Sequence, residues 1–250
     1  KLSNIQFIYG DITNLEFLRK VFKDNNFTQV CHQAAIGSVP RSVDDPMTSH
    51  KNNVDGFFNI LLCCKEYNVK RLVYASSSSV YGDDKTLPKN ESIVGTVLSP
   101  YAATKKIDEI YANIFWRCYS VETIGLRYFN VFGPRQDPNG PYAAVIPKFL
   151  STLRENKIPV INGDGSYSRD FTYISNVVEA NYLALNTTNS DAYGEAFNIG
   201  AGGNTTILKL FTTLKEKLNS KVNAILGENR PGDIPHSHAN IEKAKKILGY

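Results

Sequence analysis

The chain has 250 residues, of which 42% are apolar and 21% are charged. This composition supports a sizeable hydrophobic core and excludes wholesale disorder. The net charge is +4, and the basic residues occur at most in pairs, which argues against a nucleic-acid-binding stripe. The sequence has no run of about 18 apolar residues, so we expect no membrane span and a cytoplasmic location.

Short strands and helices alternate along the first half of the chain. Strands are expected at four apolar runs, residues 4–9, 28–35, 71–75 and 123–128. Helices are expected where apolar residues recur at helical spacing, around residues 15–22, 54–62 and 100–118, and a loop is expected before Pro46. The alternation, with mainly short links, indicates a parallel sheet with crossover helices.

Two of these helices carry start signals. Thr13 and Glu16 have the spacing of a capping box before the first helix. Ser99 is the expected N-cap of the long helix, and Pro100 follows it at the position where a missing N–H is harmless.

The second half of the chain begins with a different composition. Residues 133–141 are rich in proline and turn-forming residues, which excludes a regular element there. Beyond them we expect a helix over residues 143–156, strands at 160–161 and 171–172, and a helix after Ser175. This pattern predicts a smaller domain over the carboxyl edge of the sheet.

The cysteines and histidines give no metal-binding pattern. Cys31, Cys63, Cys64 and Cys118 lack ligand spacing and are expected to be reduced, buried thiols. The segment 236–238 (His-Ser-His) has no acidic or cysteine partner at ligand spacing, so it is expected to be a loop. No metal site is predicted.

Tyr101 and Lys105 form the sharpest local signal. Four residues apart on a helix, they lie on one face, one turn apart. A nearby ammonium favours the phenolate, which can take a proton from a hydroxyl group. Chance also produces this spacing, but here it begins a capped helix about two dozen residues after a serine-rich strand exit. Ligands collect beyond the carboxyl ends of such strands.

Around this pair the sequence resembles the NAD-dependent epimerase/dehydratase family of the extended short-chain dehydrogenase/reductase superfamily. The main matching segments are residues 76–82, 99–105 and 126–134. Further matches follow the family's order, at residues 10–12, 33–35, 52–54, 162–165, 169–171, 197–200 and 230–233. The resemblance therefore runs nearly from end to end.

The resemblance implies an α/β fold, a Rossmann-like doubly wound parallel sheet with a smaller α/β substrate domain. We expect residues 1–134 to form the NAD-binding domain and 135–250 the substrate domain, with about 171–200 contributing back to the sheet. The family's loop G-x-x-G-x-x-G is absent before Gly10, so we expect the sheet to lack its first βαβ part. We expect these 250 residues alone to bind NAD poorly and to be inactive, and the full-length protein to epimerise its substrate.

The family's functional positions can be carried over residue by residue. Tyr101 is implied as the acid/base, Lys105 as its partner and a ligand of the nicotinamide ribose, and Ser77 or Ser78 as the group that binds the reacting hydroxyl. The implied cofactor-binding residues are Asp11, Ile12, Gln33, Ala34, Ala35, Asn53, Ser76, Tyr101, Lys105 and Tyr128. The implied substrate-binding residues are Ser38, Ser78, Asn130, Ala144, Val145, Val160, Asn162, Arg169, Arg230, Asp233 and Ser237.

Within the family, the serine run favours an epimerase. The dehydratases carry an acidic pair in this run, whereas here the first carboxylate is Asp83. Residues 37–42, 135–140 and 143–147 resemble the UDP-N-acetylglucosamine/N-acetylgalactosamine 4-epimerases of surface polysaccharide synthesis. Ser237 occupies a position where a bulky side chain would block an N-acetyl group.

Several alternatives remain open at this stage. They are a 4-epimerase of UDP-hexuronates or UDP-glucose, a 4,6-dehydratase, and an inactive dinucleotide-sensing module. The implied partners are a UDP-sugar and a second copy of the chain, docked through the helices at 54–62 and 107–118. Neither a nucleic acid nor a membrane is expected.

Overall fold

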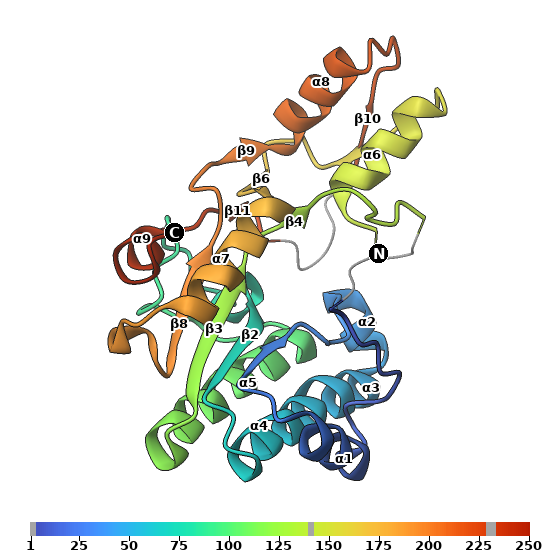
Figure 1. The fold of residues 1–250 in the computed structure, drawn as a ribbon. Coiled ribbons are helices and arrows are strands. Elements are labelled where there is room, and N and C mark those ends of the chain that lie inside the picture. The colour runs from blue at the N-terminus through green and yellow to red at the C-terminus, as the bar shows by residue number, and fades with distance from the viewer. Residues whose placement is uncertain (1–3, 140–142, 229–233) are drawn as a thin grey trace.

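A computed structural model of the chain describes residues 4–139, 143–228 and 234–250. Its central sheet has four parallel strands in the order β1-β2-β3-β8 (Figure 1). These strands are β1 (Gln29–His32), β2 (Arg71–Ser77), β3 (Glu122–Tyr128) and β8 (Glu195–Ile199). The β2–β3 register runs from Arg71 opposite Glu122 to Ser77 opposite Tyr128, so the serine run and Tyr128 share the carboxyl edge.

Helices cover both faces of this sheet. One face packs against α1 (Leu15–Asn25), α4 (Gly56–Glu66) and α5 (Pro100–Tyr119), the other against α7 (Ile174–Asn186) and α9 (Glu242–Leu248). Along β2, Leu72 and Tyr74 belong to the first layer and Val73 to the second, because successive side chains of a strand point to opposite faces. The predicted doubly wound α/β fold is therefore confirmed.

The start of α5 is as predicted, and that of α1 is not. The Ser99 hydroxyl accepts a hydrogen bond from the Ala102 N–H at 3.1 Å, as an N-cap does. In α1 the cap is Asn14, whose Oδ1 accepts from the Phe17 N–H. The predicted cap Thr13 instead donates its N–H to Asp11.

Two further expectations for the first 55 residues are wrong. Residues 4–9 form no strand, and Phe7 is 84% exposed. A strand needs a neighbour to pair with, and within the described residues β1 pairs only with β2. The expected loop before Pro46 contains α2 (Val39–Asp44), followed by α3 (Pro46–His50) and a π-helical turn (Lys51–Asp55). Ser38 and Asp45 cap the two helices.

The second half of the chain builds a smaller group of elements beyond the carboxyl edge of the sheet (Figure 1). Helices α6 (Val145–Arg154) and α8 (Ile207–Lys217) pack through Phe149 and Phe211. The strands pair as β10 (Ile225–Gly227) with β5 (Val160–Asn162), β4 (Val131–Phe132) with β7 (Thr172–Tyr173), and β6 (Ser168–Arg169) between β11 (His236–Ser237) and β9 (Thr205–Thr206). The segment expected as a loop at 236–238 is thus partly a strand. The predicted domain boundary at residue 134 stays a prediction.

Short 3-10 turns lie at Ser78–Tyr81 and Ser190–Ala192. Cys63 and Cys64 are buried, as expected, but Cys31 and Cys118 are exposed, because they lie on an edge strand and at a helix end. In the part of the chain that the structure describes, no helix has the length and apolar character needed to cross a membrane.

Candidate active site

The carboxyl end of β2 and the first turns of α5 meet at the predicted catalytic pair. Strand β2 ends at Ser77, the 3-10 turn Ser78–Tyr81 follows, and α5 packs against this turn. Tyr101 lies in the first turn of α5 and Lys105 one turn later. The fold therefore brings the serine run and the Tyr-Lys pair to one edge of the sheet.

Lys105 is fixed in place by two acceptors. Its Nζ donates to the Ala75 carbonyl at 3.0 Å and to Asp108 Oδ2 at 3.2 Å, and the residue is 2% exposed. An ammonium has three donors, so one remains for a ligand. Asp108 was not among the site residues predicted from the sequence.

Tyr101 is anchored through its backbone and leaves its phenol free. Its N–H donates to Ser42 Oγ at 3.0 Å, and its carbonyl accepts from Thr104 Oγ1 at 2.8 Å. The ring is half-buried, and its hydroxyl has no hydrogen-bond partner among the described residues. Ser42, buried in α2, was not predicted, because nothing local in the sequence connects it with a residue 59 positions away.

The serine run splits into different environments. Ser76 Oγ donates to Glu109 Oε1 at 2.7 Å, and the residue is buried, so the side chain of this predicted cofactor residue already has a partner in the packed interior. Ser77 Oγ accepts from the Ser79 N–H at 3.2 Å. Ser79 Oγ is buried with no partner in the described residues. The choice between Ser77 and Ser78 stays open.

Asn53 organises the exit of β1. Its Oδ1 accepts from the Ile36 N–H at 2.7 Å, and its Nδ2 donates to the Ile36 carbonyl and to Thr104 Oγ1. The exposed Ala34 and Ala35 are thereby held beside α5. The predicted contact of Asn53 with a dinucleotide is left as a prediction, since its amide is already occupied.

The other predicted cofactor residues have well-defined local roles. The Tyr128 hydroxyl donates to Gln33 at 3.1 Å and accepts from Asn181 at 2.8 Å, and burial raises the pKa of Tyr128 to about 12. Asn181 in α7 was not predicted. Ile12 packs so closely on α4 that a Cβ on Gly56 would lie 2.6 Å from it.

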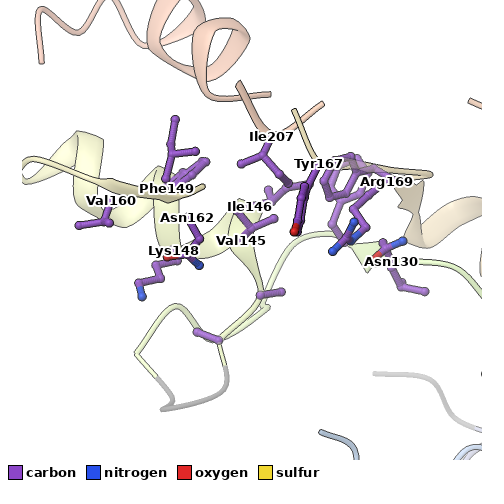
Figure 2. Close-up of a pocket in the computed structure, with 16 residues that line it drawn as sticks. Asn130, Val145, Ile146, Lys148, Phe149, Val160, Asn162, Tyr167, Arg169 and Ile207 are labelled. Carbon is purple, nitrogen blue, oxygen red and sulfur yellow. The ribbon is translucent and has the colours of Figure 1, made fainter. Parts of the chain in front are cut away.

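A cavity of about 260 Å³ lies in the smaller group of elements (Figure 2). It collects six of the predicted substrate residues, Asn130, Ala144, Val145, Val160, Asn162 and Arg169. Lys148, Phe149, Tyr167 and Ile207 also line it and were missed, since they belong to no recognisable motif. The cavity thus brings together residues from five separate segments.

The remaining predicted substrate residues lie elsewhere. Ser237 is opposite Arg169 in the β11–β6 pair but does not line the cavity. Ser38 caps α2 by accepting from the Arg41 N–H. Arg230 and Asp233 fall outside the described residues. Arg169 itself is oriented by donating from Nη1 to the Ser168 and Pro235 carbonyls.

The groups at the strand ends fit one half of a nicotinamide dinucleotide. The free Tyr101 hydroxyl, the spare Lys105 donor and the orphan Ser79 hydroxyl supply the polar atoms that a ribose and nicotinamide require. Small side chains at 34–35 leave room for a ligand. A glycine-rich turn for the pyrophosphate is absent from the sequence.

The chain is similar to known proteins of one family. Residues 1–200 match the model of the NAD dependent epimerase/dehydratase family. The putative UDP-glucose 4-epimerase of Methanocaldococcus jannaschii is 37% identical over 97% of this chain and 77% of its own length.

Two solved structures are also similar. The UDP-N-acetylglucosamine 4-epimerase from Methanobrevibacter ruminantium, in complex with UDP-N-acetylmuramic acid, has a TM-score of 0.92 and 41% identity, covering 98% of this chain and 77% of that one. The UDP-glucuronic acid 4-epimerase from Bacillus cereus, with UDP-glucuronic acid and NAD, has a TM-score of 0.89 and 32% identity, with coverages of 99% and 76%. The chain therefore belongs to the NAD dependent epimerase/dehydratase family, and it is an enzyme whose cofactor is NAD.

Proposed function

We propose that this NAD-dependent UDP-sugar 4-epimerase, an isomerase, interconverts UDP-N-acetylglucosamine and UDP-N-acetylgalactosamine. The observation that carries the choice of sugar is the small side chain of Ser237, which lies opposite Arg169 in the β11–β6 pair, and Arg169 lines the cavity. We infer that a bulkier side chain at this position would reach toward the sugar and exclude an N-acetyl group. The similarity to a UDP-N-acetylglucosamine 4-epimerase at 41% identity supports the same choice.

The proton transfer is assigned to Tyr101. As a phenolate it takes the proton of the sugar's C4 hydroxyl, and the Lys105 ammonium one helical turn away stabilises that negative charge. Tyr101 and Lys105 would hold the ribose of bound NAD, which would supply the hydride acceptor and donor for C4. Ser77 or Ser78 orients the hydroxyl. The resulting 4-keto sugar turns about its diphosphate link, Tyr101 returns the proton, and the configuration at C4 is inverted.

The nucleotide diphosphate is assigned to the cavity. Arg169 offers a planar fork of donors for phosphate oxygens, and Asn130 and Asn162 add amide groups from two other segments. Val145 and Val160 provide apolar walls. Binding energy from these groups is remote from C4, so the sugar can turn while the nucleotide stays bound.

Dehydration and a purely sensory role have less support. Asp83 is the first carboxylate after the serine run, and its Oδ1 accepts from the Thr96 N–H at 2.7 Å, which ties it to a loop. A sensory module has no need of a tyrosine and a buried lysine one turn apart on a helix at the strand ends, yet Tyr101 and Lys105 keep that spacing on α5. UDP-glucuronate or UDP-glucose 4-epimerisation is the second candidate, since relatives of both kinds match the chain.

The test offers the full-length protein three substrates in separate reactions with NAD, namely UDP-N-acetylglucosamine, UDP-glucose and UDP-glucuronate. We expect fast conversion of the first to its C4 epimer, resolved by chromatography. Ser237→Tyr is expected to lose this conversion while keeping any activity on UDP-glucose. Comparable rates on the acetylated and plain hexose would contradict the proposed specificity, and loss of water in the mass spectrum would contradict epimerisation.

We also propose that two copies pair through the outer face of α5. Ile110 and Ile114 are 54% and 45% exposed on this face, and Tyr111 packs edge-on against Phe58 of α4 with 4.9 Å between the ring centroids. This is the apolar stripe expected from the sequence, of which only Phe115 turns into the core. An exposed apolar face of this kind marks a protein–protein contact, and the same apolar face of a second copy would cover it.

A further inference from the structure

Two neighbouring acidic residues of α5, Asp108 and Glu109, have very different sets of hydrogen-bond partners. Glu109 receives two hydrogen bonds from Arg127, at 2.8 and 3.0 Å, and a third from Ser76. Burial raises the cost of its charge, but these donors outweigh it, so the pKa of Glu109 is lowered. Glu109 is thus a fully satisfied structural carboxylate.

Asp108, the preceding residue, is buried with an incomplete set of partners. It is 1% exposed, its Oδ2 accepts only from Lys105 at 3.2 Å, and its Oδ1 has no partner in the described residues. Burial raises the pKa of Asp108 to about 7 despite the opposing effect of Lys105. Because orphan buried acceptors are unfavourable, stability alone gives no reason for this carboxylate.

The geometry gives Asp108 a role through Lys105. The other acceptor of the Lys105 ammonium is the Ala75 carbonyl, which carries no net charge. Asp108 stands one turn further along the same helix face and supplies the only carboxylate on Nζ among the described residues. Together the two acceptors direct the third N–H of the ammonium.

We propose that Asp108 is a positioning residue, whose carboxylate holds the Lys105 ammonium at the carboxyl end of β2 for the NAD ribose and the Tyr101 phenolate. The inference rests on the proposed roles of Tyr101 and Lys105. It assigns Asp108 no contact with the substrate or the cofactor.

The charged state of Asp108 makes this role pH-dependent. The titratable groups that face it are Lys105 and Glu109 on α5 and Tyr74 on β2. Burial raises the pKa of Tyr74 well above its usual value, so it stays neutral, and Glu109 stays ionised. Lys105 in turn faces His32 on β1, where burial lowers the pKa to about 4. Asp108 is the acid in this set that loses its charge as the pH falls below about 7.

The test measures the NAD affinity of the full-length protein by calorimetry, up to saturation, at pH 6 and pH 8. The wild-type protein is expected to bind several-fold more tightly at pH 8, where Asp108 is ionised. Asp108→Asn is expected to bind about tenfold more weakly at pH 8 and to show no such pH dependence. Glu122→Gln, which removes the acid of the buried Arg71–Glu122 pair at the other end of the strands, is the matched control and is expected to leave NAD affinity unchanged.

A double-mutant cycle separates positioning from a structural effect. In a Lys105→Met background, Asp108→Asn is expected to cause no further loss of NAD affinity, because its target is gone. Wild-type affinity and pH dependence in Asp108→Asn, or an equal loss in both backgrounds, would overturn the inference, as would a wild-type protein without saturable NAD binding. A protein that binds NAD but epimerises no UDP-sugar would overturn the proposed function alone.

Discussion

Replacing Arg127 by methionine is the sharpest test of how the sheet and α5 are held together. The guanidinium of Arg127 donates to both oxygens of Glu109 and to the Tyr81 hydroxyl. The two side chains of the ion pair are only 4% and 8% exposed. Arg127→Met fills much of the same volume but leaves the Glu109 carboxylate in the interior with only Ser76 and the partly exposed Lys106 as donors.

The expected loss follows from the charge that remains. Removing one partner of a buried ion pair destabilises a protein by about 3–5 kcal/mol, whereas neutralising both is much milder. For a chain of about this size each kcal/mol lowers Tm by about 2–4 °C, so the single variant is expected to lose roughly 10 °C. The double variant Arg127→Met/Glu109→Gln is expected to recover most of that loss.

Thermal unfolding followed by circular dichroism, together with urea titrations, measures both variants against the wild type. We expect the wild type to be the most stable, the double variant to be less stable, and the single variant to be the least stable. A single variant as stable as the double one would refute the reasoning, because the stranded Glu109 charge would then have no cost.

Three further predictions use other parts of the molecule. Tyr101→Phe is expected to lower the epimerisation rate by about 10²–10⁴-fold while leaving UDP binding unchanged in calorimetry; a near-normal rate would remove Tyr101 from the reaction. Ile114→Glu places a charge on the exposed face of α5 and is expected to shift the mass in light scattering from two copies to one, whereas a wild type of one copy would contradict the pairing. The folded-state pKa of Asp108 is raised to about 7, so its effect favours folding at low pH and is lost as the pH rises through about 7. The unfolding midpoint of Asp108→Asn, relative to that of the wild type, is therefore expected to rise between pH 5 and pH 8. A difference that stays constant over this range would contradict the raised pKa.

Local sequence patterns account for much of the fold. The cap formed by Ser99 acts within three residues of chain, and the buried runs of β2 and β3 each lie within a single strand, so both were predictable. Residues 4–9 have the same apolar character, yet a strand also depends on a neighbour, which the local sequence does not reveal. Helix α2 was missed although Ser38 and Pro40 give a recognisable cap and first turn.

The candidate site was predictable where one helix carries it. Tyr101 and Lys105 are four residues apart on one helix, so the helical period alone predicts that they share one face of it. Asp108 lies at a spacing that also pairs with Lys105, but its burial depends on how α5 packs on β2. Ser42 and Asn181 act across 59 and 53 positions of chain. Such contacts leave no periodic signal in a single sequence, so only the fold reveals them.

The buried polar atoms without partners follow the proposed chemistry. In the described part of the chain they are Ser79 Oγ, Asp108 Oδ1, Gln136 Oε1 and Thr172 Oγ1. Ser79 lies in the turn that follows β2, and Asp108 lies on α5 with its other carboxylate oxygen on Lys105. The other two lie on or just after the β4–β7 pair, whose first strand lines the cavity. The buried pairs Arg71–Glu122 and Arg127–Glu109, by contrast, are well satisfied. A protein core normally satisfies such atoms, so their concentration at these two places indicates where the fold gives up internal hydrogen bonds in favour of a ligand and a tunable charge.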